Sequence, residues 1–286
     1  LEARLFRLGL EGYIDTSDLD GWAADDLAVG PDGTVWATSD LGRVWSSDGD
    51  DWTEHLGPPY ARFTGSEIAP DGSVWASMRK FGSQDERLSV ARLVDGEWQE
   101  EDLGIPLNLG DGGRLTIAPD GTVLLGTSSF HGNLSGWKGI QERGDEGWTP
   151  ALTIDPGSEE SYGGVGPLAA GPDGTSWAYS SGSPRDDQVW PMRQQRRTTD
   201  GWETFGDDGS VPMLVGPQDY EANFAVSGDG RLWIAFSDPA SAFFETRRQE
   251  TGVLGRGYLS TLDGSGCPGV ISFDGTGWAQ HLAGAC

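Results

Sequence analysis

The tripeptide Pro-Asp-Gly recurs along this chain, each time between two short apolar runs that are rich in β-branched, aromatic or small residues. Complete copies begin at Pro31, Pro70, Pro119 and Pro172, and a degraded copy is Gly228-Asp229-Gly230. Pro presets the corner of a turn, and Asp-Gly favours the positive φ of tight hairpins, so each copy predicts a β-hairpin. An internal repeat of this kind constrains the architecture more than any other feature does.

A second marker follows each hairpin, a turn residue and then a tryptophan. The tryptophans are Trp52, Trp98, Trp148, Trp202 and Trp278. Each repeat therefore predicts four antiparallel strands in a meander, and a repeat of roughly 40–50 residues with four strands is typical of a propeller blade. One such sheet cannot bury both of its faces, whereas several sheets packed around an axis can, and closing the ring protects their edges. We predict an all-β propeller with five blades, six being the alternative.

The repeats begin near residues 25, 65, 114, 167 and 222, so we expect one propeller domain over residues 1–286. Residues 1–30 would supply closing or linker strands. Hydrophobic residues make up 36% of the chain, which is enough for a core, and no apolar run approaches the length of a membrane span. The chain starts at Leu1 without a signal-peptide pattern, which leaves a mature product and an excised domain as alternatives.

The run Asp32–Trp45 (DGTVWATSDLGRVW), followed by DGDDW, resembles the short-repeat bacterial propellers. These include the propeller repeats of two-component regulators and the streptogramin-lyase-like group. The resemblance covers nearly the whole chain and implies the propeller fold, but it implies activity only weakly. The lyases carry an aromatic residue and then Thr-Glu after the hairpin tryptophan, with several His and Glu that bind metal and act as acid and base. Here the corresponding residues are Ala37-Thr38-Ser39, Ala76-Ser77-Met78 and Ile234-Ala235-Phe236.

The charge balance and the cysteines narrow the choice of partner and compartment. A net charge of −26 argues against a nucleic-acid partner, because the phosphate field would repel the protein. The two cysteines, Cys267 and Cys286, can form a disulfide that staples the C-terminal strand, the alternative being two buried free thiols. A disulfide implies an oxidising compartment, so we expect an extracytoplasmic bacterial protein, secreted or at the cell surface.

The candidate catalytic groups are few. His55 and His281 follow the Trp turn at equivalent positions, which indicates a structural role on outer strands, and His131 is the one histidine to consider for chemistry. The Asp residues of the repeat turns are expected to be structural. We predict no catalytic residue, no metal site and no cofactor. Calcium is the candidate ion for the acidic segments 47–51 and 206–209, with solvated turns favoured.

Two insertions into the repeat gather arginines and aromatic residues in this acidic chain, at 183–199 and 239–266. Strand connections of propellers lie on the faces where binding occurs. Arg with aromatics is typical of contact hot spots, and the guanidinium suits carboxylate or phosphate. The alternative is pairing within the acidic chain itself. The predicted partner-binding residues are Arg185, Trp190, Arg193, Arg196, Arg197, Arg247, Arg248, Arg256 and Tyr258.

The sequence thus predicts a non-catalytic extracytoplasmic propeller, a module of a sensor, surface protein or secreted factor. Its variable loops would bind a ligand or an acidic protein or glycan partner, without nucleic acid and without membrane insertion in this chain. Two alternatives stay open. One is a self-assembling surface protein whose arginine loops dock on acidic faces of the next copy. The other is an enzyme resembling the streptogramin lyases or the propeller glycosidases.

Overall fold

The computed structural model of the chain is built of strands, and no helix occurs in the part of the chain that it describes. That part comprises residues 26–39, 42–49, 51–59, 61–80, 87–106, 113–129, 139–153, 163–171, 173–181, 190–198, 200–205, 213–216, 222–236, 243–247, 254–258, 269–274 and 276–282. Nothing in these ranges is a helix long and apolar enough to cross a membrane. The chain divides into two compact units, Leu1–Leu115 and Thr116–Cys286, and each is described by itself.

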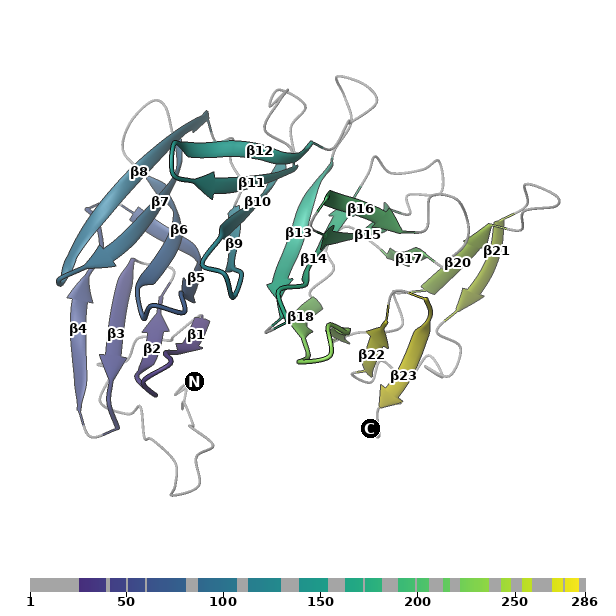
Figure 1. Cartoon of the computed structure of the whole chain (residues 1–286), viewed down its shortest axis with the longest axis horizontal. Coiled ribbons are helices and arrows are strands. Elements are labelled where there is room, and N and C mark those ends of the chain that lie inside the picture. Colours follow the sequence, from purple (N-terminus) through teal and green to yellow (C-terminus); the bar gives the residue numbers. More distant parts are fainter. Residues whose placement is uncertain are drawn as a thin grey trace. The chain divides into compact units, whose positions relative to one another are not determined.

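Unit 1 contains two four-stranded antiparallel sheets, each in sequence order (Figure 1). Blade A consists of β1 (Asp26–Val29), β2 (Val35–Thr38), β3 (Arg43–Ser47) and β4 (Trp52–Leu56). Blade B consists of β5 (Ala61–Ile68), β6 (Val74–Lys80), β7 (Arg87–Val94) and β8 (Glu97–Pro106). These are the meanders that the repeat predicts.

Unit 2 repeats the same pattern with additions. In blade C, β9 (Gly113–Ile117), where the boundary between the units falls, pairs with β10 (Val123–Ser129), followed by β11 (Gly139–Gly144) and β12 (Gly147–Thr153). Blade D consists of β13 (Gly163–Ala170), β14 (Ser176–Ser181), β15 (Trp190–Thr198) and β16 (Gly201–Phe205). Blade E consists of β18 (Ala222–Val226), β19 (Leu232–Phe236), β22 (Gly269–Phe273) and β23 (Trp278–Leu282). The predicted all-β propeller fold with four-stranded antiparallel blades is confirmed. The blade count and the single domain stay predictions, since residues 1–25 lie outside the described ranges.

Three further strands extend blade D. β17 (Met213–Gly216) pairs with the first residues of β15 and also with β20 (Phe243–Arg247), which pairs with β21 (Leu254–Tyr258). At its far end β10 also pairs with β13, through Ser128 and Ser129. Blades C and D and the extension β17-β20-β21 therefore share one hydrogen-bonded sheet.

The Pro-Asp-Gly hairpins all turn in the same way. In blade A the Gly33 amide donates to the carbonyl of Gly30 at 2.9 Å, and the Gly30 amide donates to the carbonyl of Thr34 at 2.8 Å. Gly33 has φ 87°, and Asp32 is not among the positive-φ residues. This is a type I turn closed by a left-handed glycine, so the expected positive φ belongs to Gly alone. Asp32 instead accepts the amide of Thr34 at 3.0 Å.

The predicted structural role of the turn aspartates is confirmed. Asp71, Asp120 and Asp173 accept the backbone amide two residues on, at 2.9–3.0 Å, as Asp32 does. In the degraded copy, Asp229 accepts the Ser227 hydroxyl. The backbone and side-chain hydrogen bonds from Thr34 hold the pKa of Asp32 below its usual value. Each carboxylate is thereby occupied with its own turn.

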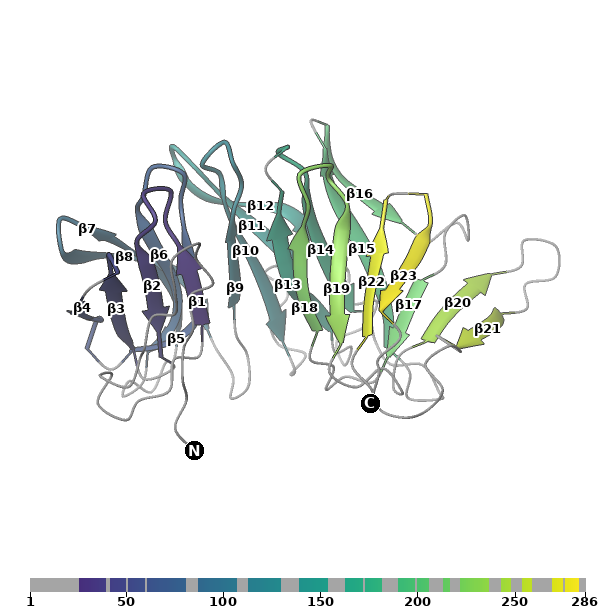
Figure 2. The same ribbon diagram turned by 90° about the horizontal axis from the view of Figure 1, so that it is seen from below.

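The meander gives each blade two different ends. The Pro-Asp-Gly turn joins the first and second strands, and the Trp turn joins the third and fourth, so both turns lie at one end, which we name the turn end. The connections between second and third strands, and from each fourth strand to the next blade, leave the opposite end, which we name the loop end. Figure 2 shows the β1–β2 and β5–β6 hairpins of unit 1 turning at a common end, and the β18–β19 and β22–β23 turns of unit 2 likewise.

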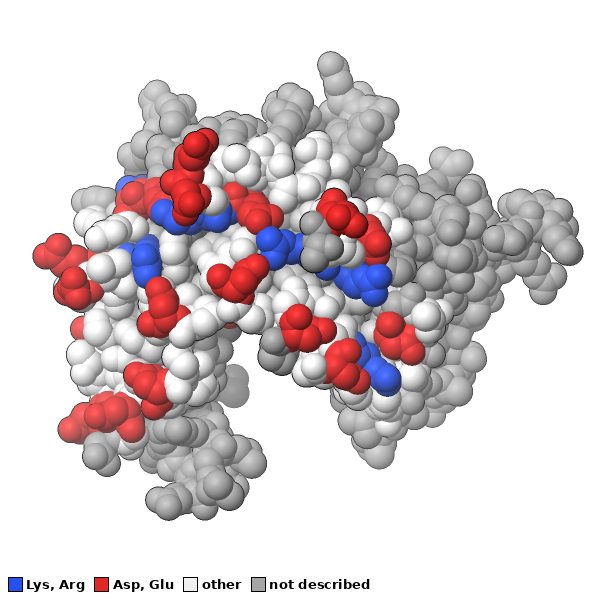
Figure 3. Space-filling model, viewed as in Figure 1, with Lys and Arg blue, Asp and Glu red and all other residues white. Residues whose placement is uncertain are grey.

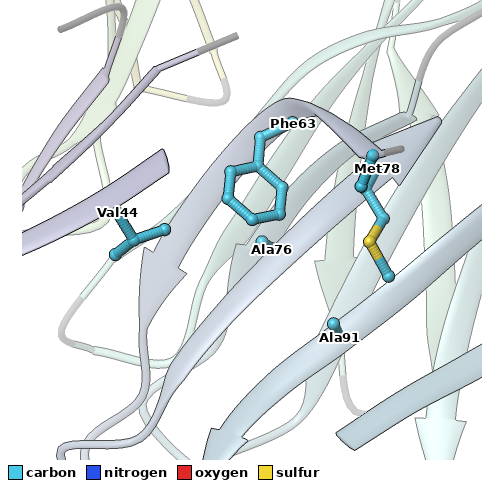
Figure 4. Packing of buried hydrophobic residues seen from close by; sticks show 6 residues of the cluster. Val44, Phe63, Ala76, Met78 and Ala91 are labelled. Carbon is cyan, nitrogen blue, oxygen red and sulfur yellow. The ribbon is translucent and has the colours of Figure 1, made fainter. Parts of the chain in front are cut away.

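Blades pack face to face through small and large apolar side chains. In unit 1, Phe63 of β5 lies between Val44 of blade A and the β6 residues Ala76 and Met78 (Figure 4). In unit 2 an equivalent cluster joins Leu124 and Ile140 of blade C to Val165, Leu168 and Ala178 of blade D. Ala76 and Ala178 each follow the hairpin tryptophan of their blade. The core of the fold therefore lies between the blades.

Candidate functional site

In blades A, B, D and E the hairpin tryptophan is covered by a polar group from the third or fourth strand of the same blade. In blade B, the Arg92 guanidinium lies 5.4 Å from the ring centroid of Trp75 and pairs with Asp71 at 2.8 Å. In blade D, the guanidinium of Arg196 lies 5.7 Å from the ring of Trp177. Arg92 and Arg196 are the cross-strand partners of these tryptophans, so they hold equivalent places in their repeats.

Histidine takes the place of arginine in blades A and E. Nε2 of His55 is 2.8 Å from the hydroxyl of Ser46, and its ring is tilted by 34° against that of Trp36, with the ring centroids 5.1 Å apart. His281 repeats this arrangement, with Ser272 at 2.7 Å and Trp233 at 4.3 Å. Burial lowers the pKa of His55, which favours the neutral ring. The predicted structural role of both histidines on outer strands is confirmed.

Arg196 and Arg197, two of the predicted partner contacts, are adjacent in β15 and lie on opposite faces of the blade. Arg196 pairs with Glu203 of its own blade at 2.8 Å. Arg197 lies between blades: it pairs with Glu142 of β11 at 2.8 Å and with Asp120 of the blade C turn at 3.5 Å. Both arginines lie near the turn end of β15. They therefore have acidic partners within the chain, and Arg197 links two blades.

The pKa of Asp120 reflects this link. Burial raises it, but the hydrogen bonds from Thr122 and the guanidinium of Arg197 outweigh burial, and the pKa lies below its usual value. Where the other repeats carry a tryptophan, blade C carries Leu124, and its cross-strand partner is Glu142. An acidic residue can stand there because Arg197 of the next blade reaches it.

The other predicted contacts gather on the extension of blade D. Trp190 and Arg193 lie in the half of β15 nearest the loop end, Arg247 ends β20, and Arg256 and Tyr258 lie in β21. Through β17, the two insertions that are far apart in the sequence belong to one sheet. Register pairs Phe243 with Tyr258 and Glu245 with Arg256. Some predicted residues lie outside the described part of the chain, and their predicted roles stay predictions. They are Arg185, Arg248, His131, Cys267 and Cys286.

The sequence analysis did not predict that two cationic residues are cross-strand partners in blade B. A regular continuation of the β5–β6 hairpin would place Arg62 opposite Lys80, but the register shifts between Phe63 and Gly65. Arg62 is therefore directly opposite Arg79. The signal that could have found this pair is the number of residues on either side of the Pro-Asp-Gly turn, and the bulge removes it.

The charged side chains of the described residues are interleaved: in the face shown in Figure 3, Lys and Arg lie among Asp and Glu. Within the described ranges, no group of three or more His, Cys, Asp or Glu side chains could hold a metal ion. Segment 206–209, one of the two candidate calcium segments, is outside those ranges. Calcium binding stays a prediction.

Comparison with known proteins bears on the fold. No family model and no curated protein matches the chain. A glucose dehydrogenase-type oxidoreductase from Thermus thermophilus aligns with 86% of this chain and 89% of its own, at 15% identity and TM-score 0.46. YCF48 bound to a D1 peptide aligns with 90% of this chain and 80% of its own, at 15% identity and TM-score 0.46.

The calcium-binding protein regucalcin from Agrobacterium tumefaciens aligns with 82% of this chain and 73% of its own, at 15% identity and TM-score 0.42. The solved structures similar to this chain are thus named as an oxidoreductase, a peptide-bound protein and a calcium-binding protein. Function has to be argued from this chain's own residues.

Proposed function

We propose that this protein is a non-catalytic, extracytoplasmic propeller module that binds an anionic protein or glycan partner through the loop end of its blades. The observation that carries the proposal is the joining of two arginine- and aromatic-bearing insertions in one sheet, β15-β17-β20-β21. Trp190 and Arg193 come from one insertion, and Arg247, Arg256 and Tyr258 from the other. Arginine and aromatic residues are enriched at contact hot spots.

The structural difference between the turn end and the loop end supports this proposal. Turns at the turn end are short and alike, and their aspartates are engaged in their own backbone, as the hydrogen bonds of Asp32, Asp71, Asp120 and Asp173 show. Connections at the loop end range from residues 39–42 to residues 237–268. Insertions are tolerated where they do not disturb the core, and binding residues concentrate there.

Arg196 and Arg197 are not the residues on which the proposal rests, because both pair with acidic side chains of the chain. The contacts of the partner would come from Trp190, Arg193, Arg247 and Arg256. Extracytoplasmic placement rests on the predicted Cys267–Cys286 disulfide.

The test is a binding screen of the purified protein against sulfated and uronic-acid glycans and against acidic peptides, at low and high salt. Arg193→Gln, Arg247→Gln and Arg256→Gln should each weaken a hit, and salt should weaken it too, since screening reduces charge attraction. Arg231→Gln, at the turn end beside Asp229, is the matched control. The proposal is wrong if the three loop-end variants bind as the wild type does.

Self-assembly is the second candidate, favoured by one observation. Among the described strands β21 pairs with β20 alone and ends the sheet. An edge strand offers unpaired backbone groups to another chain. Light scattering after size exclusion, at low and high salt, separates the two candidates: salt-reversible oligomers favour self-assembly, and a monomer at all concentrations favours a module for a different partner.

A further inference from the structure

One fully buried hydroxyl of unit 2 has no hydrogen-bond partner. The side chain of Ser176, the first residue of β14, is 0% exposed, and its Oγ is without a partner in the described part of the chain. Burying an unpaired hydroxyl is unfavourable. In the other four blades the first residue of the second strand is aliphatic, namely Val35, Val74, Val123 and Leu232. Blade D therefore departs from the repeat at a place where the repeat favours an apolar side chain.

The register places Ser176 in a row with a charged and an aromatic residue. Ser176 is directly opposite Arg197 of β15, and Arg197 is directly opposite Trp202 of β16. Directly opposed residues of neighbouring strands lie on the same face of a sheet. This face is turned toward blade C, because Ala178, two residues beyond Ser176, belongs to the apolar cluster that contains Leu124.

Blade C, which belongs to unit 2 like blade D, presents a leucine and an acidic residue to this row. Leu124 is directly opposite Glu142, which pairs with Arg197 at 2.8 Å, and Asp120 lies 3.5 Å from the same guanidinium. In the other four blades the place of Leu124 holds a tryptophan, namely Trp36, Trp75, Trp177 and Trp233. We name the two facing rows the C–D seam, which consists of Ser176, Arg197, Trp202, Leu124 and Glu142. Leucine replaces an indole in this seam and serine replaces an aliphatic residue, so two of its side chains are smaller than their counterparts in the repeat.

A second donor of the C–D seam is also unpaired. Trp202 packs against the apolar cluster between blades C and D, and its buried Nε1 is without a partner in the described ranges. The same nitrogen is unpaired in Trp52 and Trp98, so the indole by itself reflects the repeat. In blade D, however, it belongs to the same row as the unpaired hydroxyl of Ser176. Buried indole N–H groups and hydroxyls normally have partners, and a bound molecule can supply them.

We propose that the C–D seam binds a neutral sugar ring whose hydroxyl groups contact Ser176, Arg197 and Glu142. Glu142 and Asp120 set two negative charges against one guanidinium, so an anion is disfavoured here. A sugar hydroxyl can donate to a carboxylate and also accept from a guanidinium, a serine hydroxyl or an indole N–H. Neighbouring hydroxyls of one ring can therefore use the donors and the acceptors of the seam together.

The surroundings of these polar groups suit such a ring. Leu124 and the ring of Trp202 supply apolar surface for its carbon atoms, and ligand sites typically combine apolar walls with a few convergent polar groups. Asp120 is exposed and the side chain of Arg197 is partly exposed, so the seam can be reached from solvent at the turn end. The site is separate from the arginines of the loop end and takes a neutral ligand, so the inference goes beyond the proposed function.

The test is thermal unfolding of the full chain with increasing concentrations of the methyl glycosides of glucose, galactose, mannose, fucose and N-acetylglucosamine. We expect a saturable rise in the unfolding temperature with at least one of them, because a ligand that binds only the folded state stabilises it. Sugars excluded from the protein surface also stabilise proteins, but that effect does not saturate and is shared by all the glycosides.

Two variants restore the residues of the repeat. Ser176→Val removes an unpaired hydroxyl, so it should leave the sugar-free protein at least as stable as the wild type and weaken the sugar response about tenfold or more. Leu124→Trp should also abolish the response, because the indole takes the space of the ring. If Leu124→Trp does not fold, Ser176→Val still decides the outcome. Arg196→Gln, on the opposite face of β15, is the matched control and should respond as the wild type does.

A rise that does not saturate and is equal for all the glycosides would overturn the inference, and so would a Ser176→Val response equal to that of the wild type. In either case the seam holds no sugar, and a water molecule would be enough to pair its hydroxyl. Because the partner screen uses anionic partners and the loop-end arginines, failure here with success there removes only the sugar site.

Discussion

The bridge between blades C and D allows a quantitative test. The side chain of Arg197 is 19% exposed, and that of its partner Glu142 is 31% exposed. A hydrogen bond between charged groups in such a place contributes about 1.5–3 kcal/mol. The second partner, Asp120, is 62% exposed at 3.5 Å, so its pair with Arg197 contributes at most about 1 kcal/mol. We therefore expect Arg197→Gln to lower the free energy of unfolding by about 2–3 kcal/mol.

Arg196→Gln is the matched control, one residue away and on the opposite face of the same strand. Its pair with Glu203 is more exposed, and its contact with Trp177 is a cation–π interaction, so about 1 kcal/mol or less is expected. Urea denaturation followed by tryptophan fluorescence measures both variants. A double-mutant cycle of Arg197→Gln with Glu142→Gln should show a coupling energy of about 1–2 kcal/mol.

The pH dependence supplies a second check on the same bridge. The folded state lowers the pKa of Asp120, so this carboxylate stabilises the protein above its unfolded pKa of about 4, and that stability is lost as the pH falls. The difference between wild type and Arg197→Gln should therefore shrink below about pH 4. The reasoning is refuted if Arg197→Gln unfolds at the same urea concentration as the wild type, or if Arg196→Gln is the more damaging change.

We make three further predictions, two on the stability of variants and one on the state of the cysteines. Met78→Ala, at a fully buried position between blades A and B, should cost about 2–5 kcal/mol in urea denaturation, whereas Leu56→Ala, at an exposed position, should change stability by less than about 0.5 kcal/mol. The Thr276 hydroxyl and the amides of Thr276 and Gly277 lower the pKa of Asp274 to about 2. Asp274→Asn should therefore be less stable than the wild type at neutral pH, and the difference in stability should vanish as the pH falls from about 4 to about 2. A difference that does not depend on pH would contradict this. Cys267 and Cys286 should resist alkylation in denaturant until a reductant is added, as mass spectrometry would show, and immediate alkylation would exclude the disulfide.

Much of the fold follows from local chemistry that the sequence displays. The Pro-Asp-Gly copies predict the hairpins because Pro restricts φ and Gly permits the left-handed conformation, and the structure has φ 83° at Gly72 and 86° at Gly121. The two histidines follow in the same way, because equivalent positions in a repeat have equivalent surroundings. His55 and His281 accordingly make the same contacts with a serine and a tryptophan.

The partners of the candidate site residues could not be predicted in this way. The insertions could be selected as arginine-rich, but nothing in the residues says which arginine has a partner, because that depends on the neighbouring blade. Arg196 and Arg197 look alike in the sequence. One lies against the tryptophan of its own blade, and the other reaches Glu142, 55 positions away in the chain.

The amino-acid sequence by itself thus determined the four-stranded repeat, its turns, the acidic charge and the roles of residues within one blade, because those depend on contacts a few positions apart. Tertiary structure alone decided what depends on register and on packing between blades. The bulge at Thr64 places Arg62 opposite Arg79 in the register, and the short strand β17 joins two distant insertions. A one-residue change of register exchanges the partners of every later residue in a strand, and that choice is made by the sheet as a whole.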